Sequence, residues 1–217
     1  MDFLKLGSVD RLDPLALQEI STRTVGHYEA HAEAFWIGTR DHDVQQNIDA
    51  LLDALLGTGP HRILDFGCGP GRDLLAMAQR GHQVVGLDGC AAFVEQARQL
   101  TFGEVWQQDF LNLSLPEESF DGVFANASLF HVPSQELARV LSQLHASLKP
   151  GGVLFASNPR GNNEEGWAGE RYGTHLDEAA WCELFSGAGL LPVHHYYRPE
   201  GLPRRQQPWF ASVWRRR

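Results

Sequence analysis

The clearest chemical pattern in the sequence is a glycine-rich turn, GCGPG, at residues 67–71. It follows the apolar run ILDF and precedes a segment of helical periodicity, so it joins a strand to a helix. Glycine loses more conformational freedom on folding than any other residue. Three glycines here therefore indicate that the backbone comes close to something. A turn in this position offers free backbone N–H groups and the positive end of a helix dipole to a ligand.

Acidic residues after the next two strands indicate what the ligand contains. Asp88 ends the apolar run VVGLD, where a carboxylate can accept hydrogen bonds from both hydroxyls of a ribose. Asp109 and Phe110, in QQDF, follow a third strand and can supply a polar contact and an apolar wall to an adenine ring. The turn and the carboxylates together predict a nucleoside-containing cofactor. Packing of a strand–helix–strand unit alone is the alternative.

Two features of the turn bear on which cofactor it holds. The dinucleotide fingerprint is G-x-G-x-x-G, but Arg72 stands at the position of the third glycine. Asp65, two residues before the first glycine, would be unfavourable beside a pyrophosphate, whereas it can organise the turn or receive a ligand's ammonium group. This set favours S-adenosylmethionine over a dinucleotide. A nicotinamide (NAD)-dependent oxidoreductase stays open as an alternative, as does a non-catalytic S-adenosylmethionine-binding regulatory module.

Alternating strand and helix patterns position these residues. Residues 13–56 have helical patterns and end at the break GTGP, so we expect a helical segment at 1–56 and a core at 57–217. The core alternates between strands and helices with short connections, which predicts parallel pairing with right-handed crossovers. The last two strands, in PVHHYYR and PWFASVWR, fit an antiparallel hairpin. The predicted fold class is α/β, with the ligand at the carboxyl ends of the strands.

Composition and charge argue against several classes of function. The chain has 217 residues and a formal charge of −9, which disfavours binding to nucleic acid or to an acidic membrane surface. No apolar run reaches the roughly 20 residues of a membrane span, and the N-terminus lacks the apolar core of a signal peptide. Cys68, Cys90 and Cys182 form no metal-ligand or disulfide pattern. These features predict a cytoplasmic protein with reduced thiols and no metal.

Five motifs occur in the order typical of one enzyme family. They are ILDFGCGPGRD, GLD, QQDF, FDGVFANASLFHV and LHASLKPGGVLFASN. The chain resembles the class I S-adenosylmethionine-dependent methyltransferases of the small-molecule type, from about residue 25 to residue 214. The resemblance implies a Rossmann-like, mostly parallel sheet of seven strands with helices on both faces and a C-terminal antiparallel hairpin. It also implies S-adenosyl-L-methionine as the cofactor, with its methyl group toward the end of the fourth strand.

The resemblance also assigns the cofactor contacts. The turn would hold the methionine part, the second strand end the ribose, the third the adenine, and the fourth would lie near the sulfonium. The segment HYEAHAEAFW resembles a lid over the cofactor, which makes Tyr28 and Arg40 candidates for the methionine carboxylate. Plain packing of an amphipathic helix is the alternative for Tyr28. The candidate cofactor-binding residues are Tyr28, Arg40, Asp65, Gly67, Cys68, Gly69, Asp88, Gly89, Asp109, Phe110, Asn126 and Ala127.

One histidine is the candidate catalytic base. His131, in SLFHVP, follows the fourth strand, and its side chain titrates near neutrality. A base is needed only where the methyl acceptor arrives protonated. The alternative for His131 is to cap the helix that opens at residues 133–134.

The acceptor is expected to bind to segments that elaborate the core. Residues 158–177 form a long polar insertion, expected to be a loop that holds the substrate or covers the sheet edge. Its aromatic and arginine side chains, with tyrosines near the C-terminus, suit a small, polar, carboxylate-bearing molecule. Whether O, N, S or C is methylated stays open, and a monomer or a homodimer is expected. The candidate substrate-binding residues are Arg160, Trp167, Arg171, Tyr172, Tyr196 and Tyr197.

Overall fold

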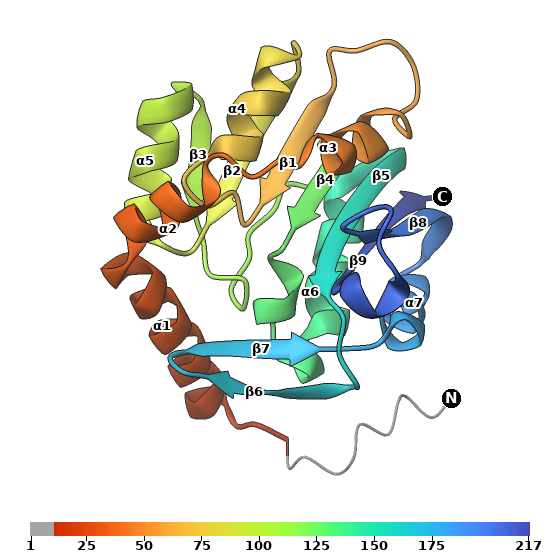
Figure 1. Cartoon of the computed structure of the whole chain (residues 1–217). Coiled ribbons are helices and arrows are strands. Elements are labelled where there is room, and N and C mark those ends of the chain that lie inside the picture. Colours follow the sequence, from red (N-terminus) through yellow and green to blue (C-terminus); the bar gives the residue numbers. More distant parts are fainter. Residues whose placement is uncertain (1–10) are drawn as a thin grey trace.

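The computed structural model describes residues 11–217 (Figure 1). The start of the predicted N-terminal segment, residues 1–10, lies outside the described residues. The helices are α1 (Pro14–Ala30), α2 (Ala32–Thr39), α3 (Gln45–Leu52), α4 (Arg72–Gln79), α5 (Ala91–Thr101), α6 (Ser134–Ser147) and α7 (Glu178–Gly187), with 3-10 turns at Leu129–His131 and Arg204–Gln206. The strands are β1 (Arg62–Phe66), β2 (Gln83–Asp88), β3 (Glu104–Gln107), β4 (Phe120–Asn126), β5 (Leu148–Pro159), β6 (Glu164–Ala168), β7 (Arg171–His175), β8 (Leu190–Arg198) and β9 (Trp209–Arg216).

A seven-stranded sheet in the order β3-β2-β1-β4-β5-β9-β8 forms the centre of the molecule (Figure 1). The strands β1 to β5 pair in parallel, whereas β9 runs antiparallel to both β5 and β8. The carboxyl ends of the parallel strands therefore share one edge, and the strand order reverses beside β1. The predicted α/β class, seven-stranded sheet and C-terminal hairpin are confirmed.

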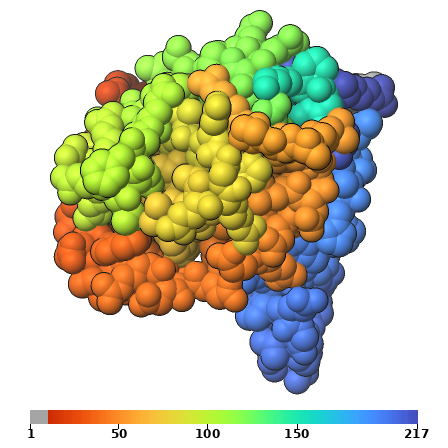
Figure 2. Space-filling view, turned by 90° about the horizontal axis from the view of Figure 1, so that it is seen from above, coloured from red at the N-terminus to blue at the C-terminus, as the bar shows by residue number. Residues whose placement is uncertain are grey.

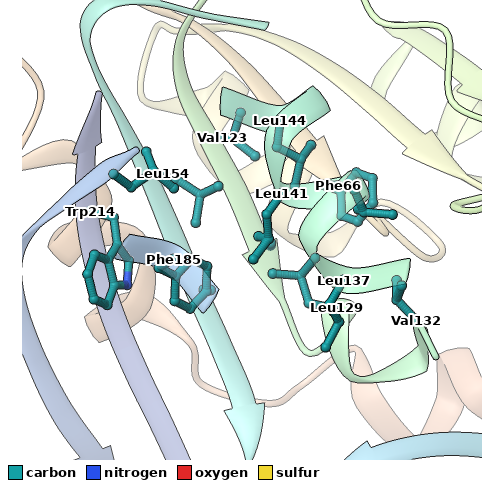
Figure 3. Close-up of a cluster of buried hydrophobic side chains, with 14 of the residues drawn as sticks. Phe66, Val123, Leu129, Val132, Leu137, Leu141, Leu144, Leu154, Phe185 and Trp214 are labelled. Atoms are coloured by element: carbon teal, nitrogen blue, oxygen red, sulfur yellow. The ribbon is translucent and has the colours of Figure 1, made fainter. Parts of the chain in front are cut away.

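Alternation along the strands places apolar side chains on both faces of the sheet. In β4, Val123 belongs to the cluster that α6 and α7 cover, and Phe124 belongs to the cluster on the α3 side. Leu137, Leu141 and Leu144 recur at helical spacing in α6 and pack onto the sheet (Figure 3). Both faces are thus covered by helices, as predicted. No helix within residues 11–217 is long and apolar enough to cross a membrane.

The polar insertion after β5 is an ordered hairpin instead of the expected loop, because β6 and β7 pair as a separate two-stranded antiparallel sheet. The hairpin packs against α1. There the backbone N–H of Tyr172 donates to Thr24 Oγ1 at 3.0 Å, and Arg23 forms an ion pair with Glu170. Figure 1 shows that α1 and this hairpin border the edge of the sheet at which the parallel strands end.

Candidate functional site

Two adjoining cavities lie at the carboxyl ends of the parallel strands. The smaller measures about 110 Å³ and is bounded by α1 and the ends of β1, β2 and β3. The larger measures about 600 Å³ and is bounded by α2, α3, β7 and the β8–β9 hairpin. Figure 2 shows the projecting blue β8–β9 hairpin and the orange N-terminal segments from outside. The residues that line both cavities are Tyr28, Phe35, Gly67, Gly69 and Ala127.

The glycine turn is the shared floor of the two cavities, but its amides are not free. The N–H groups of Gly67 and Cys68 donate to the Leu87 carbonyl at 2.8 and 3.0 Å, and that of Gly69 donates to Asp88 Oδ2 at 2.9 Å. The N–H of Gly71 donates to the Cys68 carbonyl. The expectation that free amides of the turn bind the ligand is therefore wrong. These amides shape the turn and hold Asp88.

A different steric constraint explains the absence of a side chain at each glycine of the turn. Gly67 has φ +80°, and a Cβ there would meet Ser128 Cβ at 2.4 Å. Gly71 allows α4 to approach α5, since its Cβ would lie 3.0 Å from Ala97. At Gly69 the nearest atom to an added Cβ belongs to Phe35 of α2, 3.8 Å away. A side chain at Gly69 would thus project into the cavities and not into the packed protein.

Asp88 opens into the smaller cavity from the end of β2. Its Oδ1 accepts from the Cys90 N–H and its Oδ2 from the Gly69 N–H, both at 2.9 Å. Burial raises the pKa of Asp88 to about 6, while the backbone N–H groups that it accepts from lower it. This carboxylate is held in place by main-chain donors and still lines the cavity. The neighbouring Gly89 also lines the smaller cavity.

Asp109 and Phe110 line the other side of the smaller cavity. Phe110 stacks on Phe66 with ring centres 4.3 Å apart. Asp109 Oδ2 accepts from the Ser21 hydroxyl of α1 at 2.7 Å. Helix α1 therefore closes over the region predicted for the adenine. Apart from Tyr28, the sequence analysis did not predict that residues of α1 line the smaller cavity. Their helical spacing is the signal that could have indicated it. These residues are Ile20, Ser21, Thr24 and Val25.

Asp65 lies beneath the turn and lines neither cavity. The residue is 2% exposed, and its Oδ2 has no hydrogen-bond partner within residues 11–217. Burial, and then the neighbouring Asp73, raise the pKa of this carboxyl well above its usual range, against the opposing charge of Arg72. Of the two roles considered for Asp65, its position suits organisation of the turn more than direct contact with a ligand.

The end of β4 carries a strained residue and a directed hydrogen-bond chain. Ala127 lines both cavities with φ +60°, a conformation that non-glycine residues rarely adopt and that clusters at functional sites. Asn126 Nδ2 donates to Asp73 Oδ2 at 3.0 Å, and its Oδ1 accepts from Asn47 Nδ2 at 2.9 Å. The Tyr196 hydroxyl donates to Asn47 Oδ1 at 2.8 Å. Tyr196 thus supports the cavity through α3 and does not itself line it.

His131 and Tyr28 form a pair at the wall of the smaller cavity. The Tyr172 carbonyl can only accept, so His131 Nδ1 donates to it at 2.8 Å and carries the ring proton. His131 Nε2 must then accept, and the Tyr28 hydroxyl donates to it at 2.9 Å. Burial lowers the pKa of His131 to about 4, so the ring is neutral near pH 7. His131 does not cap α6, because Glu165 accepts from the backbone N–H of Ser134.

The other candidates lie in different places. Arg171 lines the larger cavity, whereas Arg40 is exposed beside Asp41 and lines neither. Trp167 is 40% exposed under Arg23, and Tyr172 is buried against α1. Arg160 and Tyr197 pack on each other outside the cavities. The sequence analysis did not select several residues that line the larger cavity, which come from segments far apart in the chain: Trp36, Arg72, Phe130 and Trp209.

Comparisons with known proteins agree with this geometry. Residues 63–152 match a family model described as a methyltransferase domain. The chain is 36% identical over 104 residues to a trans-aconitate 2-methyltransferase of Azoarcus sp. (strain BH72), which covers 47% of this chain and 40% of the relative. The crystal structure of Burkholderia thailandensis 1,6-didemethyltoxoflavin-N1-methyltransferase, with 1,6-didemethyltoxoflavin and S-adenosylhomocysteine bound, superposes with a TM-score of 0.75 at 21% identity, covering 96% of this chain and 93% of that one. The [4+2]-cyclase SpnF superposes with a TM-score of 0.70 at 18% identity, covering 90% and 96%.

The fold is that of an α/β domain with two adjoining cavities at the carboxyl ends of its parallel strands. The family match over residues 63–152 and the relatives named as methyltransferases support a class I S-adenosylmethionine-dependent methyltransferase. The chain spans about half the length of the curated relatives it matches, 40% of one and 54% of another. The two superposed structures share too little sequence with the chain to establish more than the fold.

Proposed function

We propose that this protein transfers a methyl group from S-adenosylmethionine to a small polar metabolite. One observation carries the proposal: the smaller cavity, with Asp88 and Asp109, and the larger cavity meet at the bare backbone of Gly67 and Gly69. The smaller cavity suits the adenosine part of the cofactor. The larger cavity, at about 600 Å³, lies in the size range of small-molecule sites and leaves space for the acceptor.

The residues present fit the cofactor. Gly69 lines both cavities, and a Cβ at this position would project into them near Phe35. Asp88 presents a carboxylate at the position of a ribose, and Asp109 with Phe110 offers a polar atom and an aromatic face to an adenine. The neutral Tyr28–His131 pair closes the cavity on the side of α1.

The chemistry divides between cofactor and protein. S-adenosylmethionine supplies a methyl group that is already activated on a positively charged sulfur. The protein's task is to hold donor and acceptor in line, and such positioning can contribute roughly 7–11 kcal/mol. Asp88 and Asp109 orient the adenosine, and α1, through Ser21 and Tyr28, covers the smaller cavity and excludes water. Ala127 and Asn126 form the wall nearest to the junction of the two cavities.

The relatives support a small-molecule acceptor. One is named for trans-aconitate, and one structure holds 1,6-didemethyltoxoflavin. The cyclase among the structural neighbours shows that this fold also serves other reactions. A non-catalytic binding module and an oxidoreductase are therefore the rivals that the experiment has to separate.

The test is calorimetric titration with S-adenosylmethionine, S-adenosylhomocysteine and NAD, followed by transfer of a radiolabelled methyl group to pooled metabolites. We expect both sulfur compounds to bind, NAD not to bind, and label to appear in small molecules. Asp88→Ala should weaken binding by roughly 1.5–3 kcal/mol, the range for hydrogen bonds to charged groups. Asp53→Ala, at an exposed position after α3, is the matched control. Binding of NAD alone, or tight cofactor binding without any labelled product, contradicts the proposal.

A further inference from the structure

The site contains a histidine that cannot act as a general base without breaking its own contacts. Both ring nitrogens of His131 are occupied, Nδ1 by the Tyr172 carbonyl and Nε2 by the Tyr28 hydroxyl. Phe130 packs on the ring with a centre-to-centre distance of 4.0 Å. The tyrosine is no substitute, because burial raises the pKa of Tyr28 further above neutrality. A base would need an open lone pair toward the acceptor.

The other titratable groups around the larger cavity do not supply such a lone pair. Both carboxylate oxygens of Asp73 accept from Arg72, at 2.6 and 3.0 Å, and Oδ2 also accepts from Asn126. Asp43 and His42 are exposed, and they line the larger cavity but not the smaller one. An acceptor that arrives protonated therefore finds no group at the junction to take its proton.

Two arginines of the larger cavity have no carboxylate partner in residues 11–217. Arg171 begins β7, and its guanidinium carbon lies 5.9 Å from the centre of the Tyr28 ring, beside the shared wall. Arg198 ends β8 and donates only to the backbone carbonyl of Asp43. Guanidinium groups match carboxylates in bidentate geometry. Apolar walls complete the cavity: Trp36, Phe130, Pro199, Pro208 and Trp209.

These observations lead to a more specific inference about the methyl acceptor, and that inference rests on the proposed function. The geometry points to a small dicarboxylate as the acceptor, with Arg171 holding the carboxylate that is methylated and Arg198 holding the other. An oxygen lone pair of the first carboxylate forms the new O–CH₃ bond, while the S–CH₃ electron pair stays on sulfur. The carboxylate that reacts becomes a neutral ester group while the second carboxylate keeps its charge, the sulfonium becomes a neutral thioether, and no proton moves. His131 is a positioning residue that orients Tyr28.

The test combines a binding measurement with an analysis of the product. Calorimetry in the presence of S-adenosylhomocysteine compares short dicarboxylates with the corresponding diamides and diamines. Arg171→Gln should weaken dicarboxylate binding by about tenfold or more, the effect of losing one strong contact, and leave the affinity for S-adenosylhomocysteine unchanged. Arg80→Gln, in an exposed pair with Asp49, is the matched control. The labelled product should release volatile methanol on mild alkaline treatment, because esters hydrolyse there whereas methyl amines and ethers do not.

The outcomes separate this inference from the proposed function. Alkali-stable label, preference for an amine or phenol, or unchanged dicarboxylate binding in Arg171→Gln overturns the inference and leaves the methyltransferase proposal standing. Failure of S-adenosylhomocysteine to bind overturns both. The pH profile tests the role of His131. We expect turnover to be flat from about pH 6 to 9 in the native protein and in His131→Gln, at a lower level in the variant. A limb near neutrality that disappears in His131→Gln would make His131 the base.

Discussion

At the residue scale, the proposed cofactor site depends on one missing side chain and one placed carboxylate. Gly69 leaves the junction of the two cavities open, and Asp88 is fixed at the end of β2 by two backbone N–H groups. Gly69 follows β1 and Asp88 ends β2, so the parallel pairing of these two strands brings the residues together. Each residue leads to a prediction with its own control.

Alanine substitutions at the glycines of the turn should distinguish a loss of ligand affinity from a loss of fold stability. Gly69→Ala adds a methyl group where only Phe35 lies nearby, at 3.8 Å. We expect about tenfold or greater loss of S-adenosylhomocysteine affinity, and a stability loss of about 1–2 kcal/mol from the left-handed backbone. Gly67→Ala meets Ser128 at 2.4 Å and should destabilise the fold more. Gly26→Ala, in open space on α1, is the control for calorimetry and thermal unfolding. Equal affinity in Gly69→Ala and the native protein would contradict the site.

The pKa of Asp88 predicts how binding depends on pH. Burial raises this pKa to about 6 in the free protein, and ribose hydroxyls donate to the ionised form. Binding therefore favours ionisation, so affinity should fall as the pH decreases through 6, approaching tenfold per pH unit well below it. Adenosine is the probe, because its own groups do not titrate from about pH 5 to 8. Asp88→Asn should bind weakly with no such dependence. A flat profile in the native protein would place the ribose elsewhere.

At the element scale, a hydrogen-bond chain joins β8, α3, β4 and α4 along the wall of the larger cavity. It runs from the Tyr196 hydroxyl through Asn47 and Asn126 to Asp73. Each donor and acceptor in the chain is defined, so the orientation of the Asn126 amide depends in part on Tyr196, which does not line the cavity. Buried networks of this kind rigidify a site when every member is satisfied.

Removing the first donor of this chain should change turnover more than binding. Tyr196→Phe deletes the hydrogen bond to Asn47, worth about 0.5–1.5 kcal/mol, together with a longer contact to the Gln46 carbonyl, and frees the Asn47–Asn126 pair to reorient. We expect turnover to fall up to about tenfold while the affinity for S-adenosylhomocysteine is retained. Tyr197→Phe is the control on the same strand, because that hydroxyl donates to Glu178 outside both cavities. Identical kinetics for the two variants would show that the chain does not position Asn126.

The contact between α1 and the β6–β7 hairpin is the second feature at this scale. Arg23 pairs with Glu170 at 2.5 Å and lies 4.2 Å from the centre of the Trp167 ring. Arg23→Ala should loosen α1 over the smaller cavity, so its backbone amides should exchange with deuterium faster and S-adenosylhomocysteine should dissociate faster. The control is Arg80→Ala, which breaks an exposed pair between α4 and α3. Unchanged exchange in α1 would mean that other contacts hold the helix.

The elements differ in how far the sequence reveals them. Strand and helix patterns with glycine and proline breaks predicted the main sheet, because each element has its own periodicity. The β6–β7 hairpin was missed: its strands EEGWA and RYGTH are short, polar and interrupted by Gly166 and Gly173. The free amides of the turn were predicted wrongly, because the Leu87 carbonyl that accepts from two of them lies on the neighbouring strand. Such partners depend on tertiary structure.

At the scale of the whole molecule, the edge of the sheet gathers segments that are far apart in the chain. The larger cavity takes residues from α2, β7 and the β8–β9 hairpin, and sequence spacing does not indicate that Arg171 and Arg198 face one space while Arg40 and Arg160 do not. The residues of the strand ends that line the smaller cavity were more predictable, because parallel pairing aligns those ends at one edge of the sheet. The division at residues 56 and 57 into a lid segment and a core stays a prediction.

The most direct test of the central claim is a crystal structure of the protein with S-adenosylhomocysteine. We expect the adenosine in the smaller cavity, with its ribose hydroxyls on Asp88, its adenine between Asp109 and Phe110, and its sulfur beside Gly69 and Ala127, facing the larger cavity. A ligand bound elsewhere, or a sulfur directed away from the larger cavity, would contradict the account.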